Sequence, residues 1–164
     1  MKTGLPYACK VLLLHEKLGK VWCIFDTKHQ AVLLHTGSLI FCRLELFKNT
    51  YRFIDIEIES MLESKYVPFV HSIMKICIKA VQENVAAPEL FDFLRYVFSH
   101  MQDLTEQGRT VVLLRIFLMC DYWNYDALSY QIAISDPALA EHYDQQKLNN
   151  ILQGCWELFM KKNS

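Results

Sequence analysis

The chain has 164 residues, 52% of them hydrophobic and 21% charged, which is enough apolar material for a packed core and argues against disorder. Its formal net charge is −1, so it is not a protein that binds polyanions through overall charge alone. No apolar run reaches the roughly 18 residues that a membrane-spanning helix needs, so we expect no contact with a membrane.

Cysteine usage indicates the compartment. The six cysteines are dispersed, no two form a C-x-x-C pair, and most lie in apolar runs, where a thiol behaves as a small hydrophobe. We therefore expect reduced thiols and a cytoplasmic location, with a disulfide framework as the alternative. The apolar run near the N-terminus is short and no small-residue cleavage site follows it, so no signal peptide is expected.

The first third of the chain predicts a β-sheet. Five short runs of strand type are separated by short polar connectors. Connectors of this length favour antiparallel neighbours, and five short antiparallel strands in about 60 residues match an OB-fold barrel in size. A meander sheet capped by a helix is the alternative. The predicted strands cover residues 9–15, 20–26, 30–35, 39–47 and 50–59.

The last of these runs has the strongest alternation. Three isoleucines alternate with three carboxylates over residues 54–59, a period of two that predicts one buried face and one solvated face. The pattern points Ile54 toward the core and Asp55 toward water. Continued backward, the same alternation places Tyr51 and Phe53 on the outward face with Asp55.

The remainder of the chain predicts helices, so the expected fold is α+β: a five-stranded antiparallel OB-like barrel over residues 1–62, then an all-helical domain over residues 63–164. The run that begins at Arg109 is apolar on every side except Arg115, which predicts a central, buried helix. The predicted helices cover residues 67–85, 88–104, 109–123 and 137–162, with a polar connector before the last one.

Catalytic and metal-binding motifs are weak. His29 and His35 have five residues between them, but no cysteine pair accompanies them, so we predict no zinc site and no other cofactor. The sequence has no nucleophile elbow, no phosphate-binding loop and no dinucleotide fingerprint, so an enzyme is not expected. A catalytic cysteine–histidine pair is the weaker alternative, because neighbours in space are invisible in a sequence.

Charge is distributed unevenly. Residues 1–53 carry eight basic and three acidic side chains, a balance of +5, and the remainder carries −6. Cations that follow phosphates and aromatic rings that stack on bases are what a single-strand binder needs. The alternative is that the lysines are ordinary surface and the aromatics are core. The candidate nucleic-acid-binding residues are Lys10, Lys17, Lys20, Lys28, Arg43, Lys48, Arg52, Trp22 and Tyr51.

The order of elements resembles the RecO family of bacterial recombination mediators. The family's opening strand, turn and second strand are similar to Val11-Leu12, Leu18-Gly19 and Ile24-Phe25 here. Its helical domain has segments similar to "PELFDFL", which begins at Pro88, and to the run from Leu114 to Asp121. The basic loop after the third strand is reduced to "HTGSL", and the four-cysteine zinc module of many members is absent.

The resemblance implies a non-enzymatic role in recombinational DNA repair. The barrel would bind and anneal single- or double-stranded DNA. A RecR-like protein and single-stranded DNA-binding protein would be the partners, and together they would aid recombinase loading. The helical domain would dock the acidic tail of the latter on a cluster of cations. The candidate partner-binding residues are Lys75, Lys79, Arg95, Arg109 and Arg115.

A different class of function fits the same elements. The sheet and the helices could form a protein-interaction or scaffold module without nucleic-acid binding. Charge geometry distinguishes the two, because DNA binding requires the cations of the β-module on one face, whereas a scaffold tolerates scatter. The cations in question are Lys17, Lys20, Arg43, Lys48 and Arg52.

Overall fold

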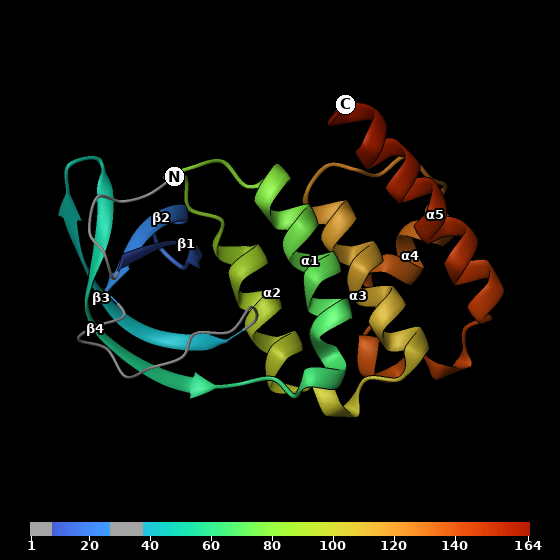
Figure 1. Ribbon diagram of the computed structural model, residues 1–164. Helices are drawn as coiled ribbons and strands as arrows, with labels where there is room; N and C mark the ends of the chain where they lie inside the picture. The colour runs from blue at the N-terminus through green and yellow to red at the C-terminus, as the bar shows by residue number, and fades with distance from the viewer. Residues whose placement is uncertain (1–7, 27–37) are drawn as a thin grey trace. The chain divides into compact units, whose positions relative to one another are not determined.

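The computed structural model describes residues 8–26 and 38–164, and Figure 1 shows its strands and helices. The α+β class is confirmed. Four of the predicted strands are present, each within one residue of its expected ends, while the predicted strand at residues 30–35 lies outside the described residues. The strands are β1 (Ala8–His15), β2 (Gly19–Asp26), β3 (Leu39–Phe47) and β4 (Thr50–Ser60).

These strands form one sheet in the order β1-β2-β4-β3. The pairs β1–β2 and β3–β4 are antiparallel, as the short connectors predict, but β2 and β4 run parallel. Two hairpins therefore lie side by side, and β3 occupies the end of the sheet because β4 returns next to β2. The expected closed barrel of five antiparallel strands is wrong for the described residues, which form an open, four-stranded mixed sheet.

The turn of the second hairpin has the conformation that a two-residue connection favours. Lys48 and Asn49 have φ angles of 45° and 62°. Positive φ at both central residues defines a type I′ turn, whose twist matches that of the flanking strands. The turn therefore sets the register in which Phe47 faces Thr50.

A β-bulge shifts the alternation of β4. Leu44 pairs with Phe53, but Arg43 pairs with Asp55, so Ile54 is an extra residue on the β4 side. Ile54 is 54% exposed, and the prediction that it faces the core is wrong. For the residues of β4 that precede Ile54, the bulge also reverses which side chains point toward the core and which point outward. Phe53 is buried and Tyr51 packs on the same apolar cluster, so the expectation that both face outward is wrong as well.

One face of the sheet carries the core of the strand unit. Phe25 and Phe53 meet edge to face with their ring centroids 6.0 Å apart, and Val21 and Cys23 complete the buried centre. Aromatic pairs of this geometry contribute about 0.5–1.5 kcal/mol beyond the apolar area that they bury. Partly buried side chains from β1, β3, β4 and the turn between β1 and β2 surround this centre: Val11, Leu13, Leu18, Ile40, Cys42, Leu44, Tyr51 and Ile56.

The chain divides into two compact units. One comprises Met1–Val67 with Val81–Phe98, and the other comprises Pro68–Ala80 with Ser99–Ser164. The predicted boundary between residues 62 and 63 was placed where the strands end and the helices begin. The two observed units are instead defined by which residues contact one another in space. The strand unit therefore takes in most of α2 (Pro88–Ser99) in addition to the sheet.

The helical unit differs from its prediction at four points, one of which is that the central helix covers Glu106–Met119 instead of residues 109–123. Helix α1 ends at Ala80, earlier than expected, and the expected connector before the last helix contains α4. The predicted last helix is divided into the 3₁₀ segment η3 and α5, because Asp144 caps α5 afresh by accepting a hydrogen bond from the Lys147 amide at 2.7 Å. The elements are α1 (Val67–Ala80), α3 (Glu106–Met119), α4 (Ala127–Ile134), η3 (Pro137–His142) and α5 (Gln145–Lys162).

Helix α3 is the centre of the helical unit, as its sequence predicts. It packs against α4, α5 and η3, and most of its apolar side chains are fully buried (Figure 1). Phe117 on α3 meets Trp156 on α5 edge to face, with ring centroids 4.9 Å apart. The fully buried residues of α3 are Val111, Val112, Leu114, Ile116 and Phe117.

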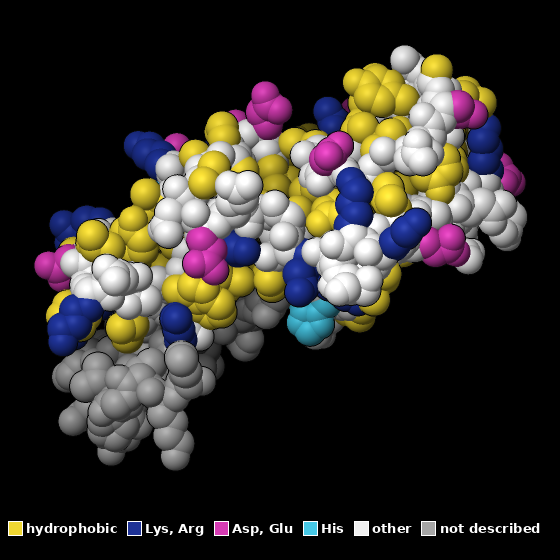
Figure 2. Space-filling model, turned by 90° about the horizontal axis from the view of Figure 1, so that it is seen from above, with side chains coloured by type: hydrophobic (Ala, Val, Ile, Leu, Met, Phe, Trp, Pro, Cys, Tyr) yellow, Lys and Arg dark blue, Asp and Glu magenta, His cyan; other side chains and the backbone are white. Residues whose placement is uncertain are grey.

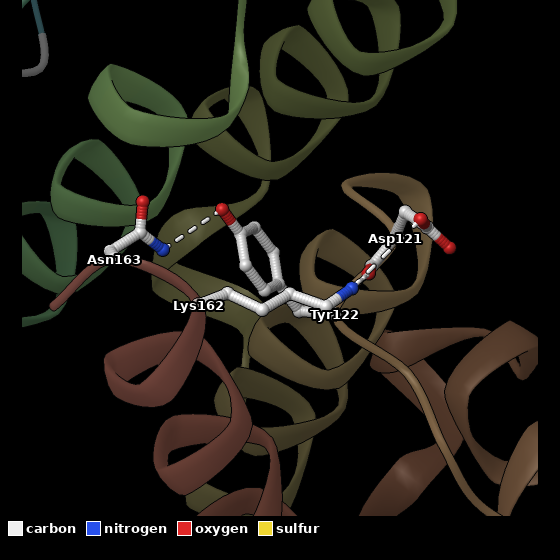
Figure 3. A network of polar contacts seen from close by, with 4 residues as sticks. All are labelled: Asp121, Tyr122, Lys162 and Asn163. Carbon is white, nitrogen blue, oxygen red and sulfur yellow. Dashed lines mark hydrogen bonds and ion pairs between the residues drawn. The ribbon is translucent and has the colours of Figure 1, made fainter.

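Polar contacts hold the end of α5 against the end of α3 (Figure 3). Lys162 Nζ donates to the Asp121 carbonyl oxygen at 2.8 Å, and Asn163 Nδ2 donates to the Tyr122 hydroxyl at 3.0 Å. The φ of Asp121 is 60°, which turns the chain out of α3 and directs its carbonyl toward α5. The last turn of α5 is therefore tied to the helical unit by both a cation and an amide.

Candidate nucleic-acid interface

The face of the sheet opposite the core gathers several of the predicted DNA-binding residues. Directly opposed residues share a face, and the register pairs Lys10 with Ile24, and Ile24 with Arg52. Trp22 and Lys20 follow Ile24 at intervals of two along β2 and point the same way. We call the surface formed by Lys10, Lys20, Trp22, Ile24 and Arg52 the outer face. The expectation that Trp22 is in phase with Lys20 is confirmed.

Trp22 lies at the centre of the outer face and has two polar partners. The Lys10 ammonium is 4.7 Å from the centroid of the indole ring, within the range of a cation–π contact. The indole Nε1 donates to Glu83 Oε1 at 3.2 Å. Glu83 is paired with Lys20 in an isolated parallel bridge, and the Asn84 amide donates to the Lys20 carbonyl at 3.0 Å. This arrangement fixes the indole in one orientation.

On β3 and the neighbouring part of β4, the cations on this side of the sheet lie next to carboxylates. Arg43 lies 3.7 Å from Asp55, and Glu45 is paired with Arg52 in the register. At the strand end of the molecule in Figure 2, basic and acidic side chains are interspersed rather than segregated. The electrostatic field over β3 is therefore weaker than the basic composition of residues 1–53 implies.

The remaining DNA-binding candidates lie elsewhere. Lys48 is at the hairpin tip, where its ammonium lies 5.5 Å from the Phe47 ring centroid. Lys17 is in the turn after β1 and lines a pocket instead of the outer face. Tyr51 belongs to the core cluster, and its ring is therefore not on the outer face. Lys28 lies outside the described residues.

The pocket that Lys17 lines has a volume of about 240 Å³ and lies between the end of β1, the start of β3 and α2. Its wall includes Arg95, which is 3.5 Å from Glu59. His15 is also part of the wall, and its Nδ1 accepts hydrogen bonds from the Lys17 and Leu18 amides at 3.0 and 3.2 Å. Burial lowers the pKa of His15, in keeping with a neutral ring that accepts at Nδ1.

The predicted partner-binding cations belong to two different units of the chain. Arg95 is on α2 of the strand unit, while the other four belong to the helical unit. Lys75 and Lys79 are exposed one turn apart on α1, and Lys75 lies 5.4 Å from the Trp156 ring centroid. Arg109 Nη1 donates to the Leu104 carbonyl at 2.9 Å, which gives this side chain a structural role. Arg115 is half-buried on α3.

Four of the described cysteines are poor candidates for a catalytic nucleophile. Burial raises the pKa of Cys23, Cys77 and Cys155 to about 12 and that of Cys120 to about 11. Thiols with these values are protonated at neutral pH, and the thiolate is the nucleophile. Within residues 8–26 and 38–164, no three His, Cys, Asp or Glu side chains form a group that could hold a metal ion, and no helix has the length and hydropathy to cross a bilayer.

The sequence does not predict two features that the structure shows near the candidate site or on the surface. Glu83 lies in a segment that was predicted to be helical, and only the fold brings it to Trp22. Helix α4 lies where the sequence predicts a polar connector, although Asp126 is a recognisable N-cap whose side chain accepts from the Ser129 amide at 2.8 Å. Comparisons with known proteins add no further information, since neither family models nor curated proteins match the chain.

Proposed function

We propose that this chain is a non-enzymatic DNA-binding protein of recombinational DNA repair, which binds and anneals DNA on the outer face of its sheet. The observation that supports this proposal best is the position of Lys10, Lys20 and Arg52 around Trp22 on adjacent strands. Cations of this kind follow phosphates, and an aromatic ring among them stacks on a base for about 1–3 kcal/mol.

The arrangement suggests how a single strand would bind. The Lys10 ammonium lies over the Trp22 ring. When a phosphate draws this ammonium away, a base takes its place on the indole, and the cation–π contact is exchanged for stacking and an ion pair. Glu83 holds the indole in place throughout. Partners similar to RecR and single-stranded DNA-binding protein, and a role in recombinase loading, follow from the resemblance to RecO and are part of the proposal.

Fluorescence anisotropy tests the proposal directly. A labelled single strand of about 30 nucleotides is titrated with the chain at several salt concentrations. The logarithm of the affinity for a single strand falls by roughly 0.7 per phosphate contact for each log unit of salt. Lys20→Gln combined with Arg52→Gln removes two cations, so it should reduce the slope of log affinity against log salt concentration by about 1.4, which is twice the value for one phosphate contact.

The matched control is Lys147→Gln combined with Lys161→Gln, which removes the same charge from exposed positions of α5. This control should retain the slope of the unmodified chain. Equal slopes for the two double variants, with unchanged circular dichroism, would refute binding on the outer face. Absence of binding at low salt would refute the DNA-binding function altogether.

The second candidate function, a protein-interaction module, is favoured by one observation. Helix α4 exposes three large apolar side chains, Leu128, Tyr130 and Ile134. Apolar clusters on a surface mark contact sites for proteins more often than for nucleic acids. If the chain does not bind DNA, this surface is the place to look for its function.

A further inference from the structure

The apolar surface of α4 is independent of the DNA-binding proposal and belongs to the helical unit. Leu128, Tyr130 and Ile134 are 58%, 43% and 39% exposed. Tyr130 and Ile134 are four residues apart and lie one above the other on the helix, whereas Leu128, two residues before Tyr130, projects from a different side of α4. The opposite side of α4, with Ile132 and Ala133, is buried. Helix α4 is thus apolar on both sides, although one of them faces water.

The sequence around this surface is acidic. The segment 121–144 contains no lysine or arginine, and the five carboxylates within it are all exposed. Its single histidine is His142. Two cations of α5 lie close to this segment: Lys162 is 4.0 Å from the Asp121 carboxylate, and Lys147 interacts electrostatically with Asp126. The carboxylates are Asp121, Asp126, Asp136, Glu141 and Asp144.

Local structure accounts for the positions of three of these carboxylates but not for their charge. Asp126, Asp136 and Asp144 are N-caps, and each accepts a hydrogen bond from a backbone amide two or three residues ahead. Asparagine caps a helix about as well as aspartate. The negative charge is therefore additional to what hydrogen bonding at the caps requires, and in the sequence it lies both before and after α4.

We propose that α4 and its flanking loops bind a basic amphipathic helix of a partner protein. The apolar side of such a helix would cover Tyr130 and Ile134, and its lysines or arginines would meet the carboxylates beyond the two ends of α4. Phosphates of DNA and anionic membrane lipids are excluded by the same negative charge. An acidic peptide is excluded as well, so this surface differs from the cationic cluster expected for an acidic tail.

A synthetic probe tests the proposal with the full chain. The probe is a fluorescein-labelled 14-residue peptide in which leucine and lysine alternate with helical periodicity, and its control is the same peptide with glutamate in place of lysine. Binding is measured by anisotropy at two salt concentrations. The lysine peptide should bind the chain at least tenfold more tightly than the glutamate peptide, and salt should weaken the lysine peptide alone.

Two variants separate the apolar and the electrostatic contributions. Tyr130→Ser with Ile134→Ser should weaken the lysine peptide at least tenfold, whereas Met160→Ser, at a 54% exposed position on α5, should leave it unchanged. Asp126→Asn with Glu141→Gln and Asp144→Asn preserves the caps and removes three charges. It should weaken binding about fivefold at low salt and flatten the salt dependence. If the serine variant does not fold, this charge variant alone decides.

Three outcomes would overturn the proposal. The first is equal binding of both peptides, which would mean that the surface adheres to any apolar helix. The second is a charge variant with unchanged affinity. The third is a dimer in sedimentation equilibrium that Tyr130→Ser with Ile134→Ser dissociates, which would identify a second copy of this chain as the occupant.

Discussion

The indole nitrogen of Trp22 donates a hydrogen bond of 3.2 Å to the carboxylate of Glu83, a residue 61 positions further along the chain. Through this contact the segment after α1 becomes part of the strand unit. The same segment is aligned with β2 by the hydrogen bond from the Asn84 amide to the Lys20 carbonyl. The outer face itself is formed by strands that precede α1, and the segment after α1 places the Glu83 carboxylate beside its cations.

Glu83→Gln should strengthen DNA binding. Glutamine retains an oxygen that accepts from Trp22, but it removes a negative charge beside Lys20. We expect single-stranded DNA to bind about 2- to 5-fold more tightly at low salt, the effect of a few tenths to one kcal/mol of surface electrostatics. Anisotropy measures this, with Glu157→Gln on α5 as the control for net charge. A gain of equal size in the control would assign the effect to overall charge.

Gly19→Ala should destabilise the strand unit. Gly19 has a φ of 68°, and a Cβ at this position would overlap the carbonyl of Val85. The substitution combines left-handed backbone strain with displacement of the segment that carries Glu83, so we expect a loss of about 1–3 kcal/mol in the free energy of unfolding. Urea denaturation followed by circular dichroism checks this. An unchanged midpoint would mean that the segment moves away without cost.

The bulge in β4 predicts opposite effects for neighbouring isoleucines. Ile54→Thr should change the free energy of unfolding by less than about 0.5 kcal/mol, because the side chain is already in water. Ile56→Thr should cost about 1–2 kcal/mol, because Ile56 packs on the core cluster. Both substitutions keep a β-branched residue, so strand propensity is matched. Equal losses at the two positions would contradict the register described above.

His15 should make the strand unit sensitive to acid. Its Nδ1 accepts from two backbone amides, and burial, opposed by Glu16 and reinforced by Lys17, lowers its pKa below the ordinary value of 6.5. The unfolded state therefore binds a proton first, and stability that is fully present above pH 6.5 is lost as the pH falls through that value toward the lowered pKa.

The comparison with His15→Gln isolates this effect. The difference in the free energy of unfolding between the unmodified chain and the variant should be largest above pH 7 and should shrink as the pH falls. Urea titrations at pH 7.5, 6.5 and 5.5 provide the three values. A difference that is constant across this range would show that His15 does not contribute to the pH dependence.

The strands were predictable because their alternation is local, and α3 was predictable because it is apolar on all sides. The side of the sheet on which Tyr51 lies was not predictable. Ile54 is an extra residue that reverses the alternation of inward and outward side chains before it, and only the pairing with β3 shows that it is extra. Helix α4 has eight residues and no apolar periodicity, so its sequence resembles a connector. At the candidate site, the phase of Trp22 with Lys20 was predictable, whereas the contact with Glu83 required the tertiary fold.

The parallel register between the hairpins has a consequence for folding. The described ladder between β2 and β4 has two residue pairs, Cys23 with Tyr51 and Ile24 with Arg52. Within each hairpin, in contrast, the two strands are paired along most of their length. Local hairpins close in microseconds, and pairing between distant segments is slower because a larger loop must be closed. The hairpins are thus expected to assemble as separate pieces and to dock late through Phe25 and Phe53. Docking of the two hairpins is therefore expected to rely on the contact between Phe25 and Phe53 as well as on the short parallel ladder.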